Sequence, residues 1–397
     1  MQINKRKGKC KSDKFQFVVD DTMTKLIDIT GKALSGEWGS DDETGDGIPV
    51  LRTTNFTNEG VVNYNDVVTR IITKKNIDNK FLRKGDIIIE KSGGSDKFPV
   101  GRVIYFNGDE NTYLFNNFTG LLRVKNQEQW FPKYVFYSLF ANYKRGGTRI
   151  YENKTTGLHN LKTDDYVSRY EVVDMNKKQQ VLICEKLDKL CEIIKLRKKE
   201  LQLLDDLIKA RFVEMFGTLD NPSQEFVKAT LKELCNKITD GKHGGCKAEE
   251  RTERYFVGAR EIYDDEVHYD TAPEINIDEF EKDYKRCNIE IGDFLIVNTG
   301  ATIGKSAIAT DKRTKHTLLQ KSVALLKVKK DVLNPVFLKW CYRVNKQMYI
   351  VESASAQPNL LLSKINSTVI YVPDIELQNQ FASFVEQVDK SKVVHYI

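Results

Sequence analysis

The most regular pattern of apolar and polar positions lies in the middle of the chain. No Gly or Pro occurs from residue 176 to residue 216, and apolar residues recur there at alternating intervals of four and three, with Arg197 and Arg211 filling two gaps. This spacing is typical of a heptad-patterned helix, and Gly217 followed by Pro222 predicts where it stops. About 40 residues at 1.5 Å each predict a length of roughly 60 Å. The positions expected to pack against a partner helix are Ile183, Leu187, Leu190, Ile194, Leu201, Leu204, Ile208 and Met215.

One apolar stripe does not stabilise an isolated helix, so a second helix is required. The segment at residues 376–390, ELQNQFASFVEQVDK, has the composition of such a partner. We therefore expect a central spacer helix at 176–216 and a shorter distal spacer helix at 376–397.

The sequences before these two helices resemble each other, which indicates an internal repeat. A Gly-Asp pair opens an apolar run in both halves, and a Ser/Thr-Gly loop and a Gly-Arg or Gly-Lys pair follow in the same order. The separation drifts only from 207 residues, between Gly85 and Gly292, to 199, between Asn160 and Asn359. The other matches pair Ser92 with Thr299, Gly101 with Gly304, residues 121–124 with 325–328, Pro132 with Pro335, and Gln180 with Gln380.

Each copy is expected to be a compact α+β domain. The Gly-Asp turn opens a short strand, a glycine loop follows, and a second strand returns. Pro132 and Pro335 suit the first turn of a helix, where a missing N–H costs nothing. The predicted organisation is a basic N-terminal tail at 1–21, domains at 22–175 and 217–375, and the two spacer helices, with a pseudo-two-fold internal repeat.

Composition excludes several classes of protein. The 397 residues are 40% hydrophobic and 30% charged, which is the composition of a folded chain rather than a disordered one. No apolar run approaches about 18 residues, and the basic amino terminus lacks the apolar core of a signal peptide. We therefore expect no membrane association and a cytoplasmic location. The net charge of +6 is mild, so nucleic-acid binding would depend on local clusters.

The cysteines do not indicate a disulfide framework or a metal site. The seven are scattered and include no Cys-x-x-Cys pair, which favours reduced thiols. His243 and Cys246 lie close together in GKHGGC, but Cys235 is the only other ligand type nearby, so we expect a turn with a free thiol and no metal.

The duplicated Gly-Asp, the Ser/Thr-Gly and Gly-Arg/Lys loop, the Asn-Leu pairs at 160–161 and 359–360, and the Gln-containing helix after each domain together resemble the specificity subunits of type I DNA restriction-modification systems. The resemblance covers nearly the whole chain and rests on the order of several weak motifs. It implies that each repeat is a target-recognition domain for one half of a split double-stranded DNA site. It further implies that the spacer helices pair antiparallel, that methyltransferase (M) and restriction (R) subunits are partners, and that this chain has no catalytic centre. The chain itself then needs no cofactor, and S-adenosylmethionine is expected in the methyltransferase subunit.

Candidate DNA contacts are the cations, amides and hydroxyls near the predicted loops. Arg and Lys suit phosphate or guanine, whereas Asn and Gln suit adenine through bidentate pairing. For any one of them, a loop-shaping or solvated surface role is the alternative. In the first copy they are Arg52, Thr53, Asn55, Lys91, Ser92, Arg102, Asn116, Asn117, Lys154, Thr155 and Thr156. In the second copy they are Arg260, Asn298, Thr299, Lys305, Lys315, His316, Gln320 and Lys321.

Enzyme signals are weak. The segment GATIGKS at 300–306 has three residues between its glycines where a phosphate-binding P-loop has four, and the first copy has Arg102 in place of the lysine. By family resemblance, a base-amino methyltransferase would carry a tandem-proline tetrad, which residues 220–223 (DNPS) do not form. An enzyme hidden in the loops remains a third possibility, but we expect catalysis to belong to a partner.

A different class of function also fits the heptad pattern, namely a homodimeric coiled-coil scaffold. The duplication argues against it, because the distal helix already supplies a partner. The unequal helix lengths leave three explanations open. The far part of the central helix docks on a methyltransferase subunit, the distal helix is shortened in this protein, or the chain is truncated.

Overall fold

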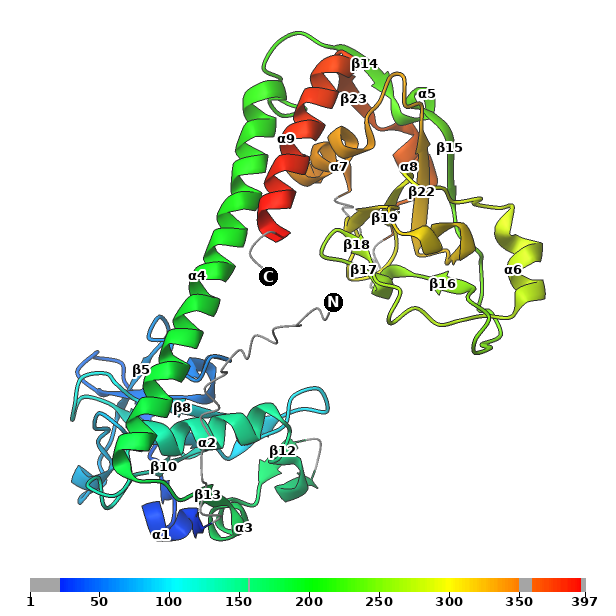
Figure 1. The fold of residues 1–397 in the computed structure, drawn as a ribbon. Coiled ribbons are helices and arrows are strands. Elements are labelled where there is room, and N and C mark those ends of the chain that lie inside the picture. Colours follow the sequence, from blue (N-terminus) through cyan, green and yellow to red (C-terminus); the bar gives the residue numbers. More distant parts are fainter. Residues whose placement is uncertain (1–21, 156–157, 350–358, 394–397) are drawn as a thin grey trace, which may run out of the picture. The chain divides into compact units, whose positions relative to one another are not determined.

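A computed structural model describes residues 22–155, 158–349 and 359–393 of the chain (Figure 1). The chain divides into two compact units, Met1–Ile194 (unit 1) and Lys195–Ile397 (unit 2). The tail expected at 1–21 and the candidate Thr156 lie outside the described residues. Both units mix helices and strands, which confirms the predicted α+β class.

The main sheet has the same strand order in both units. In unit 1 the antiparallel order is β2 (Leu34–Ser35), β10 (Thr119–Leu122), β6 (Ile87–Glu90) and β8 (Val103–Tyr105). In unit 2 it is β15 (Cys235–Asp240), β22 (Val323–Val328), β19 (Phe294–Val297) and β20 (Ser306–Ile308). The register also matches, because Ile87 faces Leu122 and Phe294 faces Leu326. The repeat is therefore a repeat of topology as well as of sequence.

Each unit also has a second sheet that contains a parallel pair of strands. In unit 1, β4 (Ile48–Leu51) runs parallel to β9 (Leu114–Phe115), and β3 (Ser40–Asp41) and β5 (Val68–Ile71) complete that sheet. In unit 2, β16 (Tyr255–Val257) runs parallel to β21 (Thr317–Leu319). Each parallel pair leads into a 3-10 turn, η1 (Thr53–Asn55) or η4 (Ala259–Glu261).

The central strands are buried on both faces. In unit 1, Ile87 and Ile89 pack in one core with Val135 of α2 (Pro132–Lys144), while Ile88 packs in a second core with Phe115. In unit 2, Phe294 and Ile296 share a core with α7 (Pro335–Val344), and Leu295 and Val297 lie in the core on the other side. Burial on both faces explains why these strands read as unbroken apolar runs rather than alternating ones.

The remaining elements also correspond. The first and last strands of each unit pair antiparallel, β1 (Met23–Lys25) with β13 (Glu171–Val173) and β14 (Val227–Thr230) with β23 (Val369–Val372). Short helices accompany them: α1 (Leu26–Thr30) and α3 (Thr163–Arg169) in unit 1, α5 (Leu231–Leu234) and α8 (Leu362–Ser367) in unit 2. Unit 1 adds η2 (Asp78–Lys80), β7 (Ser92–Gly94), η3 (Arg149–Tyr151), β11 (Glu152–Thr155) and β12 (Leu158–Leu161). Unit 2 adds β17 (Ile262–Tyr263), β18 (Glu266–Val267), α6 (Ile277–Tyr284), η5 (Lys312–His316) and η6 (Lys346–Met348).

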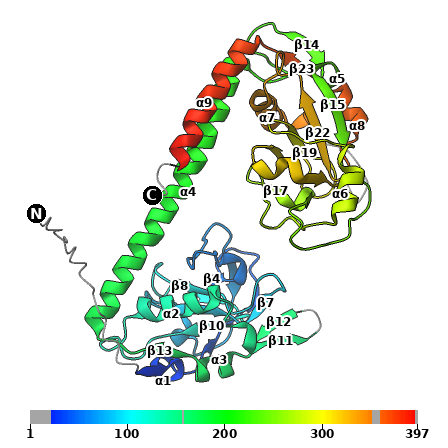
Figure 2. The same ribbon diagram turned by 45° about the vertical axis from the view of Figure 1, so that its right-hand side comes forward.

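Helix α4 (Lys177–Phe216) is continuous, and α9 (Ile375–Val393) runs antiparallel beside its C-terminal half (Figures 1 and 2). Phe212 and Phe216 of α4 contact Phe381 of α9, and Lys392 near the end of α9 pairs with Asp205 at 2.8 Å. In unit 1, Asp188 of α4 instead accepts hydrogen bonds from Lys133 and Tyr137 of α2, at 2.7 and 2.6 Å.

The predicted packing positions on α4 divide into two groups. Ile208 is buried, and Ile183, Leu187, Leu201, Leu204 and Met215 are partly buried. Leu190 and Ile194, however, are 54% and 55% exposed, so the packing expected for them was wrong within the described chain. The reason is the reach of α9, whose Lys392 is level with Arg197 and Asp205, whereas Leu190 and Ile194 lie nearer the start of α4.

The described residues include no helix that is long and apolar enough to cross a membrane. Within the same ranges, no group of three or more His, Cys, Asp or Glu side chains is placed to hold a metal ion. The described cysteines, Cys184, Cys191, Cys235, Cys246, Cys287 and Cys341, are free thiols.

Candidate functional site

Matching loops meet at the end of the main sheet in each unit. In unit 1, Leu161 N donates to Lys91 O at 2.8 Å, and Lys91 N donates to Phe118 O at 2.8 Å. These bonds join the segments after β6 and β9 and the last residue of β12. In unit 2, Leu360 N donates to Asn298 O at 2.7 Å, and Asn298 N donates to Ser322 O at 3.0 Å. The two units thus hold corresponding loops with the same backbone bonds.

A fourth segment also belongs to this loop cluster, namely the one that follows β2 in unit 1 and β15 in unit 2. Glu37 N donates to Phe115 O in unit 1, and Lys242 N donates to Leu319 O in unit 2. The preceding glycines are required there, because a Cβ on Gly36 would lie 2.2 Å from the Phe115 carbonyl oxygen and one on Gly241 would lie 2.0 Å from that of Leu319. No side chain tolerates such a distance to backbone, so this crossing is a fixed part of both sites.

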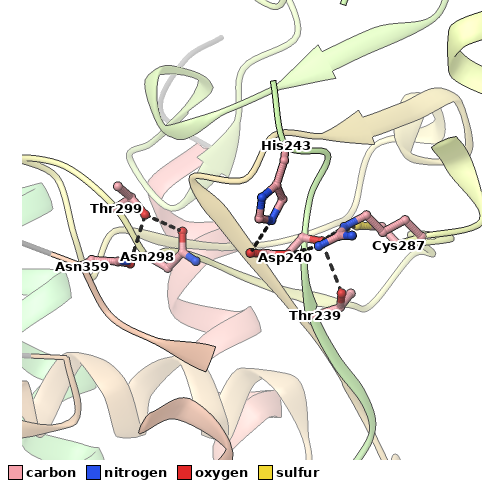
Figure 3. Close-up of polar contacts among 8 residues, drawn as sticks. Thr239, Asp240, His243, Cys287, Asn298, Thr299 and Asn359 are labelled. Atoms are coloured by element: carbon pink, nitrogen blue, oxygen red, sulfur yellow. Dashed lines mark hydrogen bonds and ion pairs between the residues drawn. The ribbon is translucent and has the colours of Figure 1, made fainter. Parts of the chain in front are cut away.

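In unit 2 the loop cluster surrounds a polar pocket of about 440 Å³, lined by Gly244, Thr299, Gln320, Lys321, Ser322 and Asn359. Thr299 lies between two amides, since its hydroxyl is 3.3 Å from Asn298 Oδ1 and 3.2 Å from Asn359 Oδ1 (Figure 3). The pocket therefore presents amide, hydroxyl and ammonium groups on a supported backbone.

Asp240, the last residue of β15, anchors the neighbouring loop. Its carboxylate accepts from Arg286 at 2.5 Å and lies 3.3 Å from His243 Nε2 (Figure 3). Its carbonyl accepts from Arg286 Nε and Cys287 Sγ, at 3.0 and 3.4 Å. These contacts hold the start of the segment GKHGGC, which the sequence predicts to be a turn rather than a metal site.

The corresponding place in unit 1 holds a different set of side chains. Lys91 Nζ donates to Ser35 Oγ at 3.1 Å, and burial lowers the pKa of Lys91, with Lys80 acting in the same direction. In the turn between β9 and β10, Asn117 is exposed, whereas Asn116 is 4% exposed. Of the candidates in unit 1, Lys91, Ser92 and Asn117 therefore lie on the two segments that the Lys91 N–Phe118 O bond joins, with Asn117 exposed and Lys91 and Ser92 partly buried.

Other candidates in unit 1 shape a separate loop. Asn55 is 1% exposed, accepts from Arg52 N at 2.8 Å, and donates to Asn63 O and Asp66 O at 3.0 Å each. The Arg52 guanidinium pairs with Asp66 at 2.9 Å. We therefore revise Asn55 to a loop-shaping residue, because its amide groups are used within the chain.

Arg102 also has an internal role. Its guanidinium donates to Phe56 O and Thr53 O, at 2.9 and 2.8 Å, and pairs with Glu90 at 3.3 Å. Burial raises the pKa of Glu90, and Arg102 opposes that shift. Lys154 and Thr155 belong to β11, and the backbone there pairs with His159 and Leu158.

In unit 2, Asn298, Thr299, Gln320 and Lys321 come together at the pocket, but the remaining candidates do not line it. Arg260, Lys305 and Lys315 are exposed on other turns. Burial lowers the pKa of His316, with Arg254 adding to the shift, which disfavours its cationic form. Residues 300–305 connect two antiparallel strands, β19 and β20, and not a strand to a helix, which removes the P-loop reading.

Sequence reasoning missed Asn359 and Phe118 as site residues. Asn359 was available as the match of Asn160, and its position opposite Thr299 follows from the strand pairing around the glycine loop. Phe118 belongs to the loop cluster through its carbonyl, and the two amides before it indicate a turn but not a binding role.

The fold and loops define a class of protein in which two similar domains each present a polar surface and each continue into a helix. The chain matches the model of the "Type I restriction modification DNA specificity domain" twice, over residues 21–205 and 223–394, and therefore belongs to that family. It is a specificity subunit with two tandem domains, in a family that supplies DNA specificity and not catalysis. The homodimeric scaffold alternative finds no support.

Solved structures are similar in fold. The type I restriction-modification S subunit from M. genitalium aligns with a TM-score of 0.55 and 16% identity, covering 96% of this chain and 92% of that one. A structure from a study of complex assembly and conformational transition of the type I R-M system aligns with a TM-score of 0.52 and 14% identity, covering 94% and 90%. No curated protein matches the chain in sequence.

Proposed function

We propose that this specificity subunit reads a double-stranded DNA site in two parts, one part by each unit. The observation that carries the proposal is that both units hold their loops with the same backbone hydrogen bonds. Lys91 and Asn298 donate through equivalent backbone N–H groups, while their side chains differ. Two domains with the same loop backbone but different side chains are suited to recognise two different DNA sequences. Chemistry on the DNA then belongs to partner methyltransferase and restriction subunits, with S-adenosylmethionine bound by the methyltransferase.

The side chains at the two sites support reading of base edges and phosphates. Amides pair with adenine in the major groove, and lysines meet guanine or phosphate. In unit 2 the relevant groups are Gln320, Lys321 and Asn359. In unit 1 they are Lys91 and Asn117, so the two half-sites should differ in sequence.

Exposed apolar side chains on α4 support the docking of a protein partner. Leu190, Ile193 and Ile194 are exposed in the part that belongs to unit 1, and Leu196, Leu203 and Leu207 in the part that belongs to unit 2. Such a set of exposed large apolar residues is unusual on a solvated helix and is typical of an interface. We assign it to the methyltransferase subunits, which corresponds to the first of the three explanations for the unequal helix lengths.

An exchange of segments tests the two-reader proposal. Residues 25–173 are replaced by the corresponding segment of a related specificity subunit, and the chimera is combined with the cognate methyltransferase. Methylation-sensitive sequencing of DNA from cells that express each version then gives the site. We expect one half-site to change and the other to stay the same, and a change in both halves would overturn the proposal.

A further inference from the structure

Phe118 is an exposed aromatic residue on a well-supported turn. It is 54% exposed and lies at the tip of the connection between β9 and β10. Its carbonyl accepts from Lys91 N at 2.8 Å, and Asn116 O accepts from both the N–H and the hydroxyl of Thr119, at 3.1 and 2.8 Å. Because residues on both sides are fixed by these bonds, the backbone holds Phe118 at the surface of the candidate site.

The fold does not require a phenylalanine there. The equivalent residue in unit 2 is Ser322, whose carbonyl accepts the matching bond from Asn298 N at 3.0 Å. The Ser322 hydroxyl is used internally, since it donates to Gln320 Oε1 at 3.0 Å and accepts from Ala259 N at 3.1 Å. The same backbone position therefore has an exposed phenyl ring in unit 1 and an internally bonded hydroxyl in unit 2.

We propose that Phe118 is a specificity-determining residue of unit 1 and contacts the 5-methyl group of a thymine in its half-site. This inference rests on the proposed function. Thymine is the base that presents an apolar group in the major groove, and a phenylalanine is one of the side chains that suits it. The nearest candidates on the two joined segments, exposed Asn117 and partly buried Lys91, are polar and suit a neighbouring base edge and a phosphate.

An intercalating role fits these surroundings less well. Side chains that wedge between base steps are apolar residues inserted into the minor groove, where they unstack the bases. Phe118 follows Asn117, which is exposed, and Asn116, which is 4% exposed, so the apolar contact that this turn offers is the size of one ring. That area matches a methyl group on the surface of a base better than an opened base step.

The test uses the full chain in complex with its cognate methyltransferase. DNA duplexes carry the recognised site with thymines of the first half-site replaced one at a time by deoxyuridine, which removes only the 5-methyl group. We expect one replacement to weaken binding by about fourfold, the effect of one buried methyl group. Phe118→Ser should bind the thymine and deoxyuridine duplexes equally, whereas Phe118→Leu should keep the discrimination.

A matched control is Phe98→Ser. Phe98 is 53% exposed in the same unit but lies outside the turn, between β7 and β8, so its loss should leave the discrimination unchanged. The thermal unfolding of all three variants should match that of the parent, since each replaced side chain is at the surface.

The outcomes separate the inference from the proposed function. If the parent complex binds a specific site but no deoxyuridine replacement in that half-site matters, the inference is wrong. If Phe118→Ser weakens binding to thymine and deoxyuridine duplexes equally and keeps their ratio, Phe118 acts as a wedge or a nonspecific contact, which also overturns it. If no duplex is bound with sequence preference, the proposed function falls and the inference with it.

Discussion

Gln180 and Gln378 make the same three hydrogen bonds at the starts of α4 and α9. Gln180 donates to Gln129 O and Met175 O, at 3.0 and 2.8 Å, and accepts from Phe131 N at 2.7 Å. Gln378 donates to Val332 O and Pro373 O, at 3.0 and 2.7 Å, and accepts from Asn334 N at 2.9 Å. Both side chains are fully buried. Each glutamine therefore joins a spacer helix to the segment that precedes α2 or α7.

Replacing Gln378 by Ala should destabilise unit 2 by roughly 2–4 kcal/mol, because three backbone groups lose their partner and a buried volume is emptied. The matched control is Gln380→Ala, which removes an exposed side chain of the same type two residues away and should change stability by less than about 0.5 kcal/mol. Thermal unfolding followed by circular dichroism measures both. Equal unfolding curves for the two variants would contradict the role assigned to Gln378.

The equivalence of Gln180 and Gln378 was not predicted from the sequence. The repeat was expected to pair Gln180 with Gln380, but the hydrogen bonds identify Gln378 as the partner. Counting from Asp174 and Asp374 gave equal spacings. In the structure, however, two residues, Pro373 and Asp374, join β23 to α9, whereas three, residues 174–176, join β13 to α4. An equal distance in sequence from an aspartate does not show that two residues are equivalent. Two buried amides with the same three hydrogen-bond partners do show it, because buried polar groups need specific partners.

Much of the fold could nevertheless be predicted. The apolar runs after Gly85 and Gly292 identified the central strands, and Pro132 and Pro335 identified helix starts. The heptad pattern predicted a long helix but not its burial. Phe212 and Phe216, which lie beside the expected stripe, form the aromatic core with Phe381, because a helix that packs on a domain as well as on α9 buries a wider face.

The candidate site was less predictable than the fold. Residue type alone could not separate Asn55, which is buried and shapes a loop, from Asn117, which is exposed at the surface. Both are amides in turn-forming segments, and only the backbone groups nearby decide whether an amide is used internally. Asn359 entered the site through its pairing opposite Thr299, a long-range contact that local sequence does not encode.

Changing exposed apolar residues in the part of α4 that belongs to unit 1 should affect assembly and not folding. In the double variant Leu190→Gln and Ile193→Gln, both side chains are more than half exposed in the described chain, so the unfolding temperature should stay within about 2 °C of the parent. Copurification with the cognate methyltransferase subunit should fall at least about tenfold, because central apolar anchors dominate interface energies.

The control for this double variant is Lys189→Gln, which alters an exposed polar residue in the same helical turn and should leave copurification unchanged. If the double variant assembles as well as the parent, this part of α4 is not the docking surface. If instead it unfolds at a clearly lower temperature than the parent, Leu190 and Ile193 pack within the chain.

Gln320 gives a test of base reading in unit 2. It lines the pocket with Thr299 and Asn359, and its Oε1 is held by the Ser322 hydroxyl at 3.0 Å, which orients the amide. An oriented amide pairs with adenine in bidentate fashion and discriminates by about 1–3 kcal/mol. Gln320→Ala should therefore lose roughly ten- to hundredfold preference at one position of the half-site read by unit 2.

The control is Gln347→Ala, whose exposed amide donates to Asp220 at 3.0 Å and lies outside the pocket lining. Selection from a randomised duplex library by the methyltransferase complex would measure both variants, and the half-site read by unit 1 should be the same in each. A relaxed preference in both half-sites, or in neither, would contradict the assignment of Gln320 to one reader.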